Sequence, residues 1–324
     1  DDTLVMMDDV LEEITKYFKS LGREMTENNK KQAIMPSRAT VFHNDAGTAP
    51  GFALEKDGKY IICMPGPPRE MKRMFQKSVV PFLQSMIDGA LYYRQIRFFG
   101  IGESMLETQL LDLIDNQTDP TLATYAKEGE CSLRIASKRD TEEEAEQAVD
   151  EMLEKVKERV GHYIYSCDDE ELAQVVADRL MEQGLTLSSA ESCTGGMFAS
   201  TMTDIPGISQ CFDRGLVTYS NQAKMEELGV SAETLEKFGA VSEETALEMV
   251  EGLQRVSGSD VCISVTGIAG PGGGSEEKPV GLVYIGFSYG DKKICKKIQM
   301  RNVNRSWNRH YTLLCMLNVI YRNI

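Results

Sequence analysis

The strongest constraint on the fold is a regular alternation of helical and extended segments between residues 168 and 324. Apolar residues recur at helical spacing in 170–184 and 242–258, and short apolar runs such as 260–267 lie between the helices. Two further extended runs close the pattern as a hairpin before a last helix. Helices that alternate with strands in this way predict a three-layer α/β/α sandwich with a mostly parallel sheet.

The preceding region, 89–166, follows a different pattern. Two segments, 92–101 and 130–138, look extended, and "SMLETQLLDLID" looks helical. A long helix follows Thr141, which forms a capping box with Glu144, and Gly161 ends it. Its many acidic residues are typical of the solvated face of an amphipathic helix, with a partner-binding surface as the alternative. We therefore predict a small α+β domain here.

Residues 1–88 predict only part of an α/β domain. An amphipathic helix around Val10 and Phe18 precedes a loop, a strand, a Lys-Asp-Gly turn and a second strand at 60–64. A Pro/Gly cluster ends that strand, and another amphipathic helix, 70–83, follows. The strands are too few for a complete sheet. The predicted domains are therefore 1–88, 89–166 and 167–324.

Composition excludes several classes of function. The formal charge of −15 disfavours sequence-independent nucleic-acid binding, which requires clustered Lys and Arg. Eight scattered cysteines without a CxxC pair are typical of reduced thiols, and three isolated histidines argue against a His-built metal site. No apolar run reaches the length of a membrane span and no signal peptide is recognisable, so we expect a cytoplasmic protein without a membrane partner.

The stretch "SSAESCTGG", 188–196, lies between a predicted strand and a predicted helix. Open α/β sheets bind ligands at the carboxyl ends of their strands, so Ser192 or Cys193 is placed to act as a nucleophile beside an anion-binding turn. Alternatively, Ser192 or Thr194 caps the helix, and Cys193 is a small buried side chain. The stretch considered alone favours the cap.

Two other segments carry candidate groups. Lys224, in "YSNQAK", can act as a base for a serine if it is removed from water near Tyr219, although a lone lysine is more often solvated. The loop "TGIAGPGGGSEEKPVG", 266–281, can present backbone N–H groups to an anion or act as a flexible connector. It is neither a Walker A loop nor a dinucleotide fingerprint. Arg305 and Arg309 either add charge for a phosphate or lie on the surface.

Taken together, "AESCTGG", "VTYSNQAK", "GAVSEE" and the glycine loop resemble the C-terminal domain of the CinA (competence/damage-inducible) family, a nicotinamide mononucleotide deamidase domain. Upstream, "NDAGTAPGF" and "MPGPPREM" resemble the family's molybdopterin-binding-like (MoCF) domain. "GIGESMLETQL" and "DPTLATYAKEGECSLRIASK" resemble its KH-type middle domain. The implied fold is a three-layer α/β/α C-terminal domain, a small α+β KH-like domain and a partial MoCF-like α/β domain.

The resemblance implies hydrolysis of nicotinamide mononucleotide to nicotinic acid mononucleotide and ammonia, without a metal or other cofactor. Ser192 is the implied nucleophile, Lys224 its base and Tyr219 a hydrogen-bonding partner of the pair. Arg305 stands in "VNR" where family members usually have "GDR". The implied oxyanion and substrate-binding residues are Thr194, Gly195, Gly196, Asn221, Thr266, Gly267, Gly270 and Arg305.

Other implied properties concern the whole family protein. Its members have a further α/β half before the equivalent of Thr3, so residues 1–88 are expected to be a fragment of that domain. A divalent-metal-dependent ADP-ribose pyrophosphatase activity is implied for the complete domain rather than for these residues. The implied partners are a pyridine mononucleotide and a second copy in a homodimer. The competing hypotheses are a non-catalytic nucleotide-binding module and a competence-related nucleic-acid-processing protein, which the acidic charge disfavours.

Overall fold

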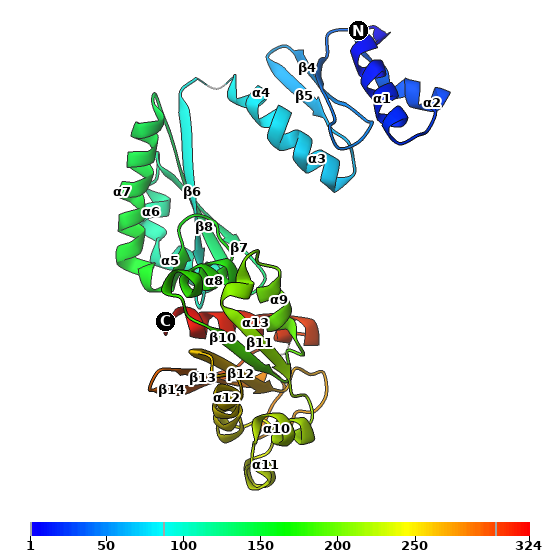
Figure 1. Cartoon of the computed structure of the whole chain (residues 1–324). Helices are drawn as coiled ribbons and strands as arrows, with labels where there is room; N and C mark the ends of the chain where they lie inside the picture. The colour runs from blue at the N-terminus through cyan, green and yellow to red at the C-terminus, as the bar shows by residue number, and fades with distance from the viewer. Residues whose placement is uncertain (1, 87, 302) are drawn as a thin grey trace. The chain divides into compact units, whose positions relative to one another are not determined.

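The computed structural model describes residues 2–86, 88–301 and 303–324. The chain forms two compact units, Asp1–Gly89 and Ala90–Ile324, each with its own core (Figure 1). All eight cysteines are free thiols. In the described parts of the chain, no helix combines the length and the apolar character needed to cross a bilayer.

The first unit contains two small antiparallel sheets, β1-β2 and β3-β4-β5. The amphipathic helix α1 buries Val10 and Ile14 against Ala33 and Met35, as its apolar spacing predicts. The predicted helix after the Pro/Gly cluster is present and includes one π-helical turn. The elements are β1 (Leu4–Met6), α1 (Asp8–Ser20), α2 (Glu27–Lys30), β2 (Ile34–Pro36), β3 (Thr40–Phe42), β4 (Gly51–Lys56), β5 (Lys59–Cys63), α3 (Pro68–Met74) and α4 (Val80–Gln84).

The second unit begins with an antiparallel four-stranded sheet in the order β7-β8-β6-β9. The long helix α7 packs one face on this sheet through residues such as Val149 and Val156. Thr141 caps α7 by accepting a hydrogen bond from the Glu144 N–H, as predicted. The strands β7 and β9 were not predicted. The elements are β6 (Ala90–Phe98), α5 (Glu103–Gln109), α6 (Leu111–Asp115), β7 (Thr121–Ala126), β8 (Cys131–Arg139), α7 (Glu142–Val160) and β9 (Ile164–Ser166).

The rest of this unit is built on a five-stranded sheet in the order β11-β10-β12-β13-β14. β10 pairs in parallel with both β11 and β12, and the terminal hairpin adds two antiparallel pairings, so β13 alone opposes the other strands of this sheet. The elements are α8 (Leu172–Gln183), β10 (Leu187–Glu191), α9 (Met197–Thr203), β11 (Phe212–Val217), α10 (Asn221–Leu228), α11 (Ala232–Phe238), α12 (Glu243–Ser257), β12 (Val261–Gly267), β13 (Leu282–Tyr289), β14 (Lys292–Gln299) and α13 (Arg305–Tyr321).

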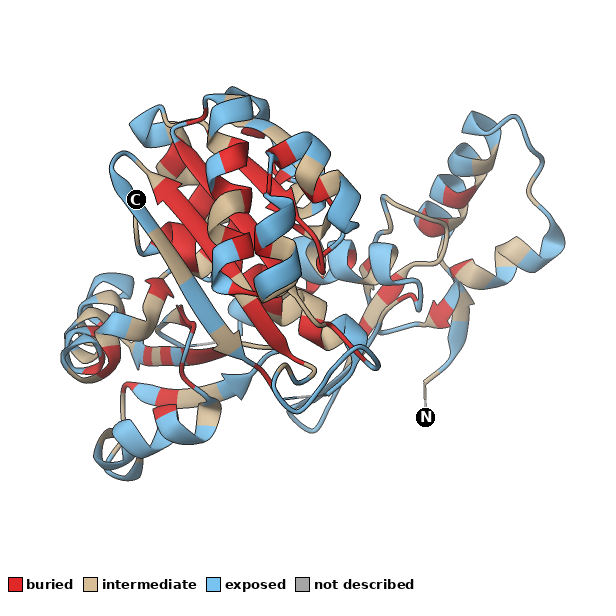
Figure 2. Cartoon of the chain, turned by 90° about the horizontal axis from the view of Figure 1, so that it is seen from below, coloured by how far each residue is buried: buried red, intermediate tan, exposed pale blue. Residues whose placement is uncertain are grey.

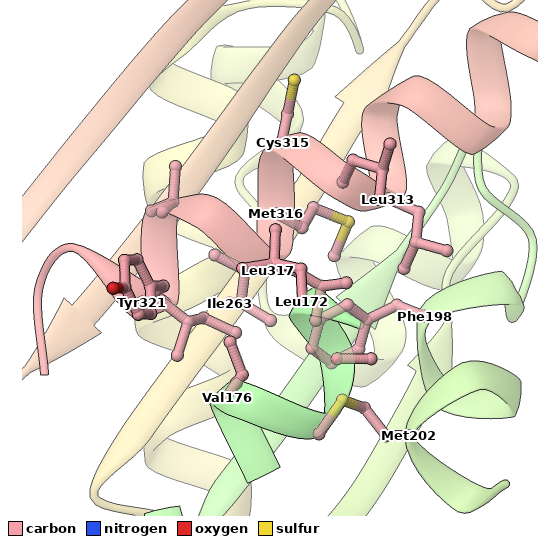
Figure 3. Packing of buried hydrophobic residues seen from close by; sticks show 14 of the residues in the cluster. Leu172, Val176, Phe198, Met202, Ile263, Leu313, Cys315, Met316, Leu317 and Tyr321 are labelled. Atoms are coloured by element: carbon pink, nitrogen blue, oxygen red, sulfur yellow. The ribbon is translucent and has the colours of Figure 1, made fainter. Parts of the chain in front are cut away.

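Helices cover both faces of this sheet, which makes the predicted three layers. On one face, α8, α9 and α13 pack on alternate residues of β12 such as Ile263, and Figure 3 shows Leu172, Phe198 and Met316 meeting there. On the other face, α10, α11 and α12 cover Cys262 and its neighbours. The interior strands β10 and β12 between these layers are almost wholly buried, whereas the edge strand β14 is largely exposed (Figure 2).

The small sheet and the three-layer region pack directly against each other within the second unit. A Cβ atom added at Gly129, in the β7–β8 turn, would lie 2.9 Å from side-chain atoms of both Leu314 and Tyr311 on α13. Phe99, just after β6, packs against Tyr311 with ring centroids 5.7 Å apart. These contacts fix the turn against α13, and the boundary proposed at 166/167 stays a prediction.

Candidate active site

Ser192 is the first residue after β10, at the carboxyl end of an interior strand of the sheet. Its backbone N–H donates to the Val265 carbonyl at 3.1 Å, which extends the parallel pairing with β12 by one residue. The residue is 8% exposed. The sheet therefore holds the Ser192 hydroxyl in a fixed position at the edge where ligands bind in such folds.

Lys224 lies beside this hydroxyl. Its Nζ donates to Ser192 Oγ at 3.1 Å, to the Thr218 carbonyl at 2.7 Å and to the Tyr219 carbonyl at 3.4 Å. The side chain is 1% exposed on α10, whose N-terminus is capped by the Ser220 hydroxyl. The helix that follows β11 thus delivers a buried amine to the end of β10.

No carboxylate neutralises this amine: Lys224 makes no ion pair with any residue in 2–86, 88–301 or 303–324. Burial lowers the pKa of Lys224, because removal from water penalises its charged form. A neutral amine can donate its two N–H groups to the Thr218 and Tyr219 carbonyls and turn its lone pair to the Ser192 hydroxyl. The contacts of Lys224 Nζ with Ser192, Thr218 and Tyr219 are therefore those expected of a general base that takes the proton of the Ser192 hydroxyl.

The rival nucleophile, Cys193, is in a different state. Burial raises the pKa of its thiol to about 12, and the residue is 6% exposed. A thiol is nucleophilic as its thiolate, which is scarce at neutral pH when the pKa is so high. The geometry favours Ser192 over Cys193.

In the turn after Ser192, two of the three backbone N–H groups predicted to bind the oxyanion are already hydrogen-bonded within the protein. The Gly195 N–H donates to the Ser192 carbonyl at 3.1 Å, and the Gly196 N–H donates to the Glu191 carboxylate at 3.0 Å. Both groups are thus used inside the turn, for which both glycines adopt positive φ. Of the three predicted oxyanion donors, the Thr194 N–H alone donates to no oxygen among the described residues. The same is true of the Cys193 N–H, and both N–H groups lie close to the Cys193 sulfur.

Glu191 is a residue that the sequence analysis missed. It is fully buried, and its carboxylate accepts hydrogen bonds from Gly196, Phe198 and Ala199 N–H groups at 2.9–3.1 Å. These donors belong to the first turn of α9 and the residue before it, where a negative charge is stabilised by the helix dipole. Glu191 therefore fixes the turn that follows Ser192. An acidic residue directly before a Gly-rich helix start was the available signal.

Arg305 and Tyr219 form the outer part of the site. Arg305, the first residue of α13, donates to the Gly270 carbonyl at 2.7 Å and to the Tyr219 hydroxyl at 3.1 Å. The predicted pairing of the Tyr219 hydroxyl with Ser192 and Lys224 is thus not observed, since only the Tyr219 carbonyl contacts Lys224. The side chain of Tyr219 is instead 60% exposed.

Thr266 and Gly267, two of the predicted substrate-binding residues, line the same cavity, but the Thr266 hydroxyl already donates a hydrogen bond. It donates to the Ala240 carbonyl at 2.6 Å and so holds the segment between α11 and α12 in place. Ala240 and Val241 of that segment line the cavity and were not predicted. The cavity measures about 190 Å³ and is lined by Ser192, Cys193, Tyr219, Lys224, Ala240, Val241, Thr266, Gly267, Ala269 and Arg305.

Three other candidates lie outside this lining. Asn221 is exposed at the start of α10, and Gly270 contributes its carbonyl to Arg305 rather than an N–H group to the cavity. Arg309 donates to the Thr194 carbonyl and supports the turn from behind. In the described residues no group of three or more His, Cys, Asp or Glu side chains is arranged to hold a metal ion.

A close approach between two helices fixes the position of α10. A Cβ atom added at Gly252 on α12 would lie 1.8 Å from the Leu228 carbonyl oxygen at the end of α10. The same oxygen accepts a hydrogen bond from Arg255 at 2.9 Å. The helix that carries Lys224 is thus seated on α12 without an intervening side chain.

Comparison with known proteins agrees with the resemblance seen in the sequence. A putative competence-damage inducible protein of Caldicellulosiruptor saccharolyticus is 51% identical over 285 residues, which cover 88% of this chain and 69% of the relative. The chain belongs to the CinA family. A protein of the same description from Acetivibrio thermocellus is 43% identical over 321 residues, covering 99% of this chain and 78% of that relative.

The family models that match describe three regions of the CinA chain. They are the probable molybdopterin binding domain at 2–85, the damage-inducible protein CinA KH domain at 93–166 and the CinA C-terminal domain at 169–324. Among solved structures, the competence/damage inducible protein CihA of Agrobacterium tumefaciens has 43% sequence identity and a TM-score of 0.46, and covers 47% of this chain and 92% of its own.

Proposed function

We propose that this chain is a serine-dependent amidohydrolase that converts nicotinamide mononucleotide and water into nicotinic acid mononucleotide and ammonia. The observation that carries the proposal is the 3.1 Å contact between Ser192 Oγ and the buried, carboxylate-free Nζ of Lys224. An activated serine is a nucleophile for acyl transfer, and an amine with a lowered pKa is a base suited to activate it. The substrate class comes from the resemblance to the CinA C-terminal domain.

The first half of the reaction forms an ester. Ser192 Oγ attacks the carboxamide carbon while neutral Lys224 Nζ takes the hydroxyl proton. The N–H groups of Cys193 and Thr194, which donate to no oxygen in the described residues, are the donors available to the negative oxygen of the tetrahedral intermediate. The intermediate collapses as the Lys224 ammonium returns the proton to the departing nitrogen, which leaves as ammonia and leaves an ester on Ser192.

The second half hydrolyses that ester. Lys224 takes a proton from water, whose oxygen attacks the ester carbon, and the collapse returns the proton to Ser192 Oγ. The carboxylate product then leaves. In this scheme the pyridine ring that bears the carboxamide occupies the cavity. The exposed guanidinium of Arg305, at the rim of the cavity, is available to the substrate phosphate.

The test is ammonia release from nicotinamide mononucleotide, with and without a chelator. We expect Ser192→Ala to abolish turnover and Ser200→Ala, an exposed serine on α9, to leave it unchanged. Activity that survives the chelator would separate this reaction from a metal-dependent pyrophosphatase. Normal turnover by Ser192→Ala would refute the proposal, and mononucleotide binding without any ammonia release would support the non-catalytic alternative.

A further inference from the structure

A second cavity in the same unit lies apart from Ser192 and Lys224. It measures about 530 Å³ and lies between the small antiparallel sheet and the start of α13. Its lining includes Gly102, Lys127 and Glu130 from the first region and Arg301, Trp307 and Tyr311 from the second. None of these residues lines the cavity around Ser192. We call this space the interdomain cleft.

The interdomain cleft has an aromatic wall. The rings of Trp307 and Tyr311 are stacked with centroids 5.0 Å apart and planes within 6° of each other. Both side chains are only partly buried, and neither the Trp307 indole N–H nor the Tyr311 hydroxyl has a hydrogen-bond partner in the described residues. A preformed stack of this kind can be extended by a third flat ring.

The cleft also carries two unpaired cations. Lys127 and Arg301 are exposed, and neither makes an ion pair within the described part of the chain. The same lining also holds two acidic residues, Glu103 and Glu130, so the cations and the carboxyl groups are balanced in number. The two cations suit a phosphate, since Arg and Lys donate charge-assisted hydrogen bonds to its oxygens.

Glu130 adds an acceptor to the cleft. The residue is partly buried, and burial raises the pKa of its carboxyl group. One of its oxygens is buried without a hydrogen-bond partner. Glu130 lines the same cleft as the aromatic stack, and a carboxyl group there is suited to bind the exocyclic amino group of a base or a sugar hydroxyl.

We propose that the interdomain cleft binds a purine nucleoside monophosphate, with the base stacked on Trp307 and the phosphate between Lys127 and Arg301. The stacked rings, the carboxyl group and the two cations match the three parts of such a ligand. A two-ring base covers more of an indole face than a single ring does.

Trp307 is the sole tryptophan of the chain, so its fluorescence reports directly on this cleft. We expect saturable quenching when AMP or GMP is added to the full chain, weaker quenching with adenosine and none with inorganic phosphate. Arg301→Ala should weaken AMP binding and leave adenosine binding unchanged, whereas Lys138→Ala, an exposed lysine outside the lining, should change neither.

A blocking variant locates the ligand. Gly102 has φ −88° and ψ 156°, and an added Cβ would meet no atom within 4 Å, so Gly102→Leu fills the cleft without backbone strain. We expect it to raise the apparent Kd for AMP about tenfold or more, equivalent to about 1.4 kcal/mol. Gly66→Leu is the matched control, because a Cβ there also meets open space. Absence of saturable quenching by both nucleotides, or undiminished quenching in Gly102→Leu, would overturn the proposal.

Discussion

Two lysines, one in each unit of the molecule, have opposite surroundings: Lys77 is exposed and paired with a carboxylate, and Lys224 is buried without one. In the first unit, Lys77 and Arg73 both pair with Asp45 at exposed positions, and these partners hold the pKa of the Asp45 carboxyl well below its usual range. In the second unit, Lys224 is buried with a hydroxyl and two carbonyls and without a carboxylate. A carboxylate partner keeps a lysine charged, whereas burial among neutral acceptors favours the neutral amine. The second arrangement is the one that can accept a proton.

The largest test of this contrast replaces each lysine with methionine. We expect Lys224→Met to lower the rate of ammonia release by about 100- to 10,000-fold, the usual contribution of a general base. Lys77→Met should leave the rate unchanged, since Lys77 belongs to the other unit. Urea unfolding should show that both variants stay folded. If the Lys224→Met variant kept most of its activity, Lys224 would not be the general base.

A second test concerns the buried carboxylate rather than the buried amine. Glu191→Gln removes the charge that three N–H groups of the α9 start share, and we expect it to lower the free energy of unfolding by about 2–3 kcal/mol. The rate should fall as well, because the turn after Ser192 loosens. Glu233→Gln, an exposed acid in the first turn of α11, is the matched control. Equal stability of the two variants would show that Glu191 does not fix the turn.

The pH dependence tests the protonation state directly. Below the lowered pKa of Lys224 the neutral fraction, and with it the rate, should rise about tenfold per pH unit and then level off above that pKa. Between the lowered pKa and the ordinary value of 10.5, the unfolded chain binds more protons at this site than the folded one. The free energy of unfolding should therefore increase with pH in that window. Lys224→Met should lose this increase, and an identical profile in the variant would assign the titration to another group.

The smallest expected effect is at Cys193. Because burial keeps its thiol protonated, Cys193→Ala should change the rate far less than Ser192→Ala does. Alkylation followed by peptide mass spectrometry should label the exposed Cys63 at neutral pH and leave Cys193 unlabelled. Rapid labelling of Cys193 together with loss of activity would make it the nucleophile instead.

The sequence predicted well those features that depend on neighbouring residues. The helix cap at Thr141 and the helix end at Gly161 follow from local chemistry and are confirmed. Membership of the CinA family is confirmed as well. The resemblance also implied that Ser192 and Lys224 act together, and their side chains are in contact in the structure.

The remaining differences arise where distant segments meet. The Tyr219 hydroxyl turns to Arg305, which is 86 residues away in the chain, and no local pattern shows this. The Gly195 and Gly196 N–H groups are used by Ser192 and Glu191 because the turn folds back on the strand that precedes it. The short strands β7 and β9 depend on pairing with β8 and β6 rather than on a strong pattern of their own.

The contact between Gly252 and the Leu228 carbonyl makes the distance between α10 and α12 depend on the absence of a side chain at position 252. Position 252 does not line the cavity around Ser192, yet a single methyl group there would push against the backbone of the helix that carries Lys224. Such a change would shift Lys224 relative to Ser192, which follows β10, and would also shift part of the cavity wall, because Lys224 itself lines the cavity. In a directed-evolution library, variation at this helix contact would therefore change the separation of Lys224 and Ser192 without replacing any residue that lines the cavity.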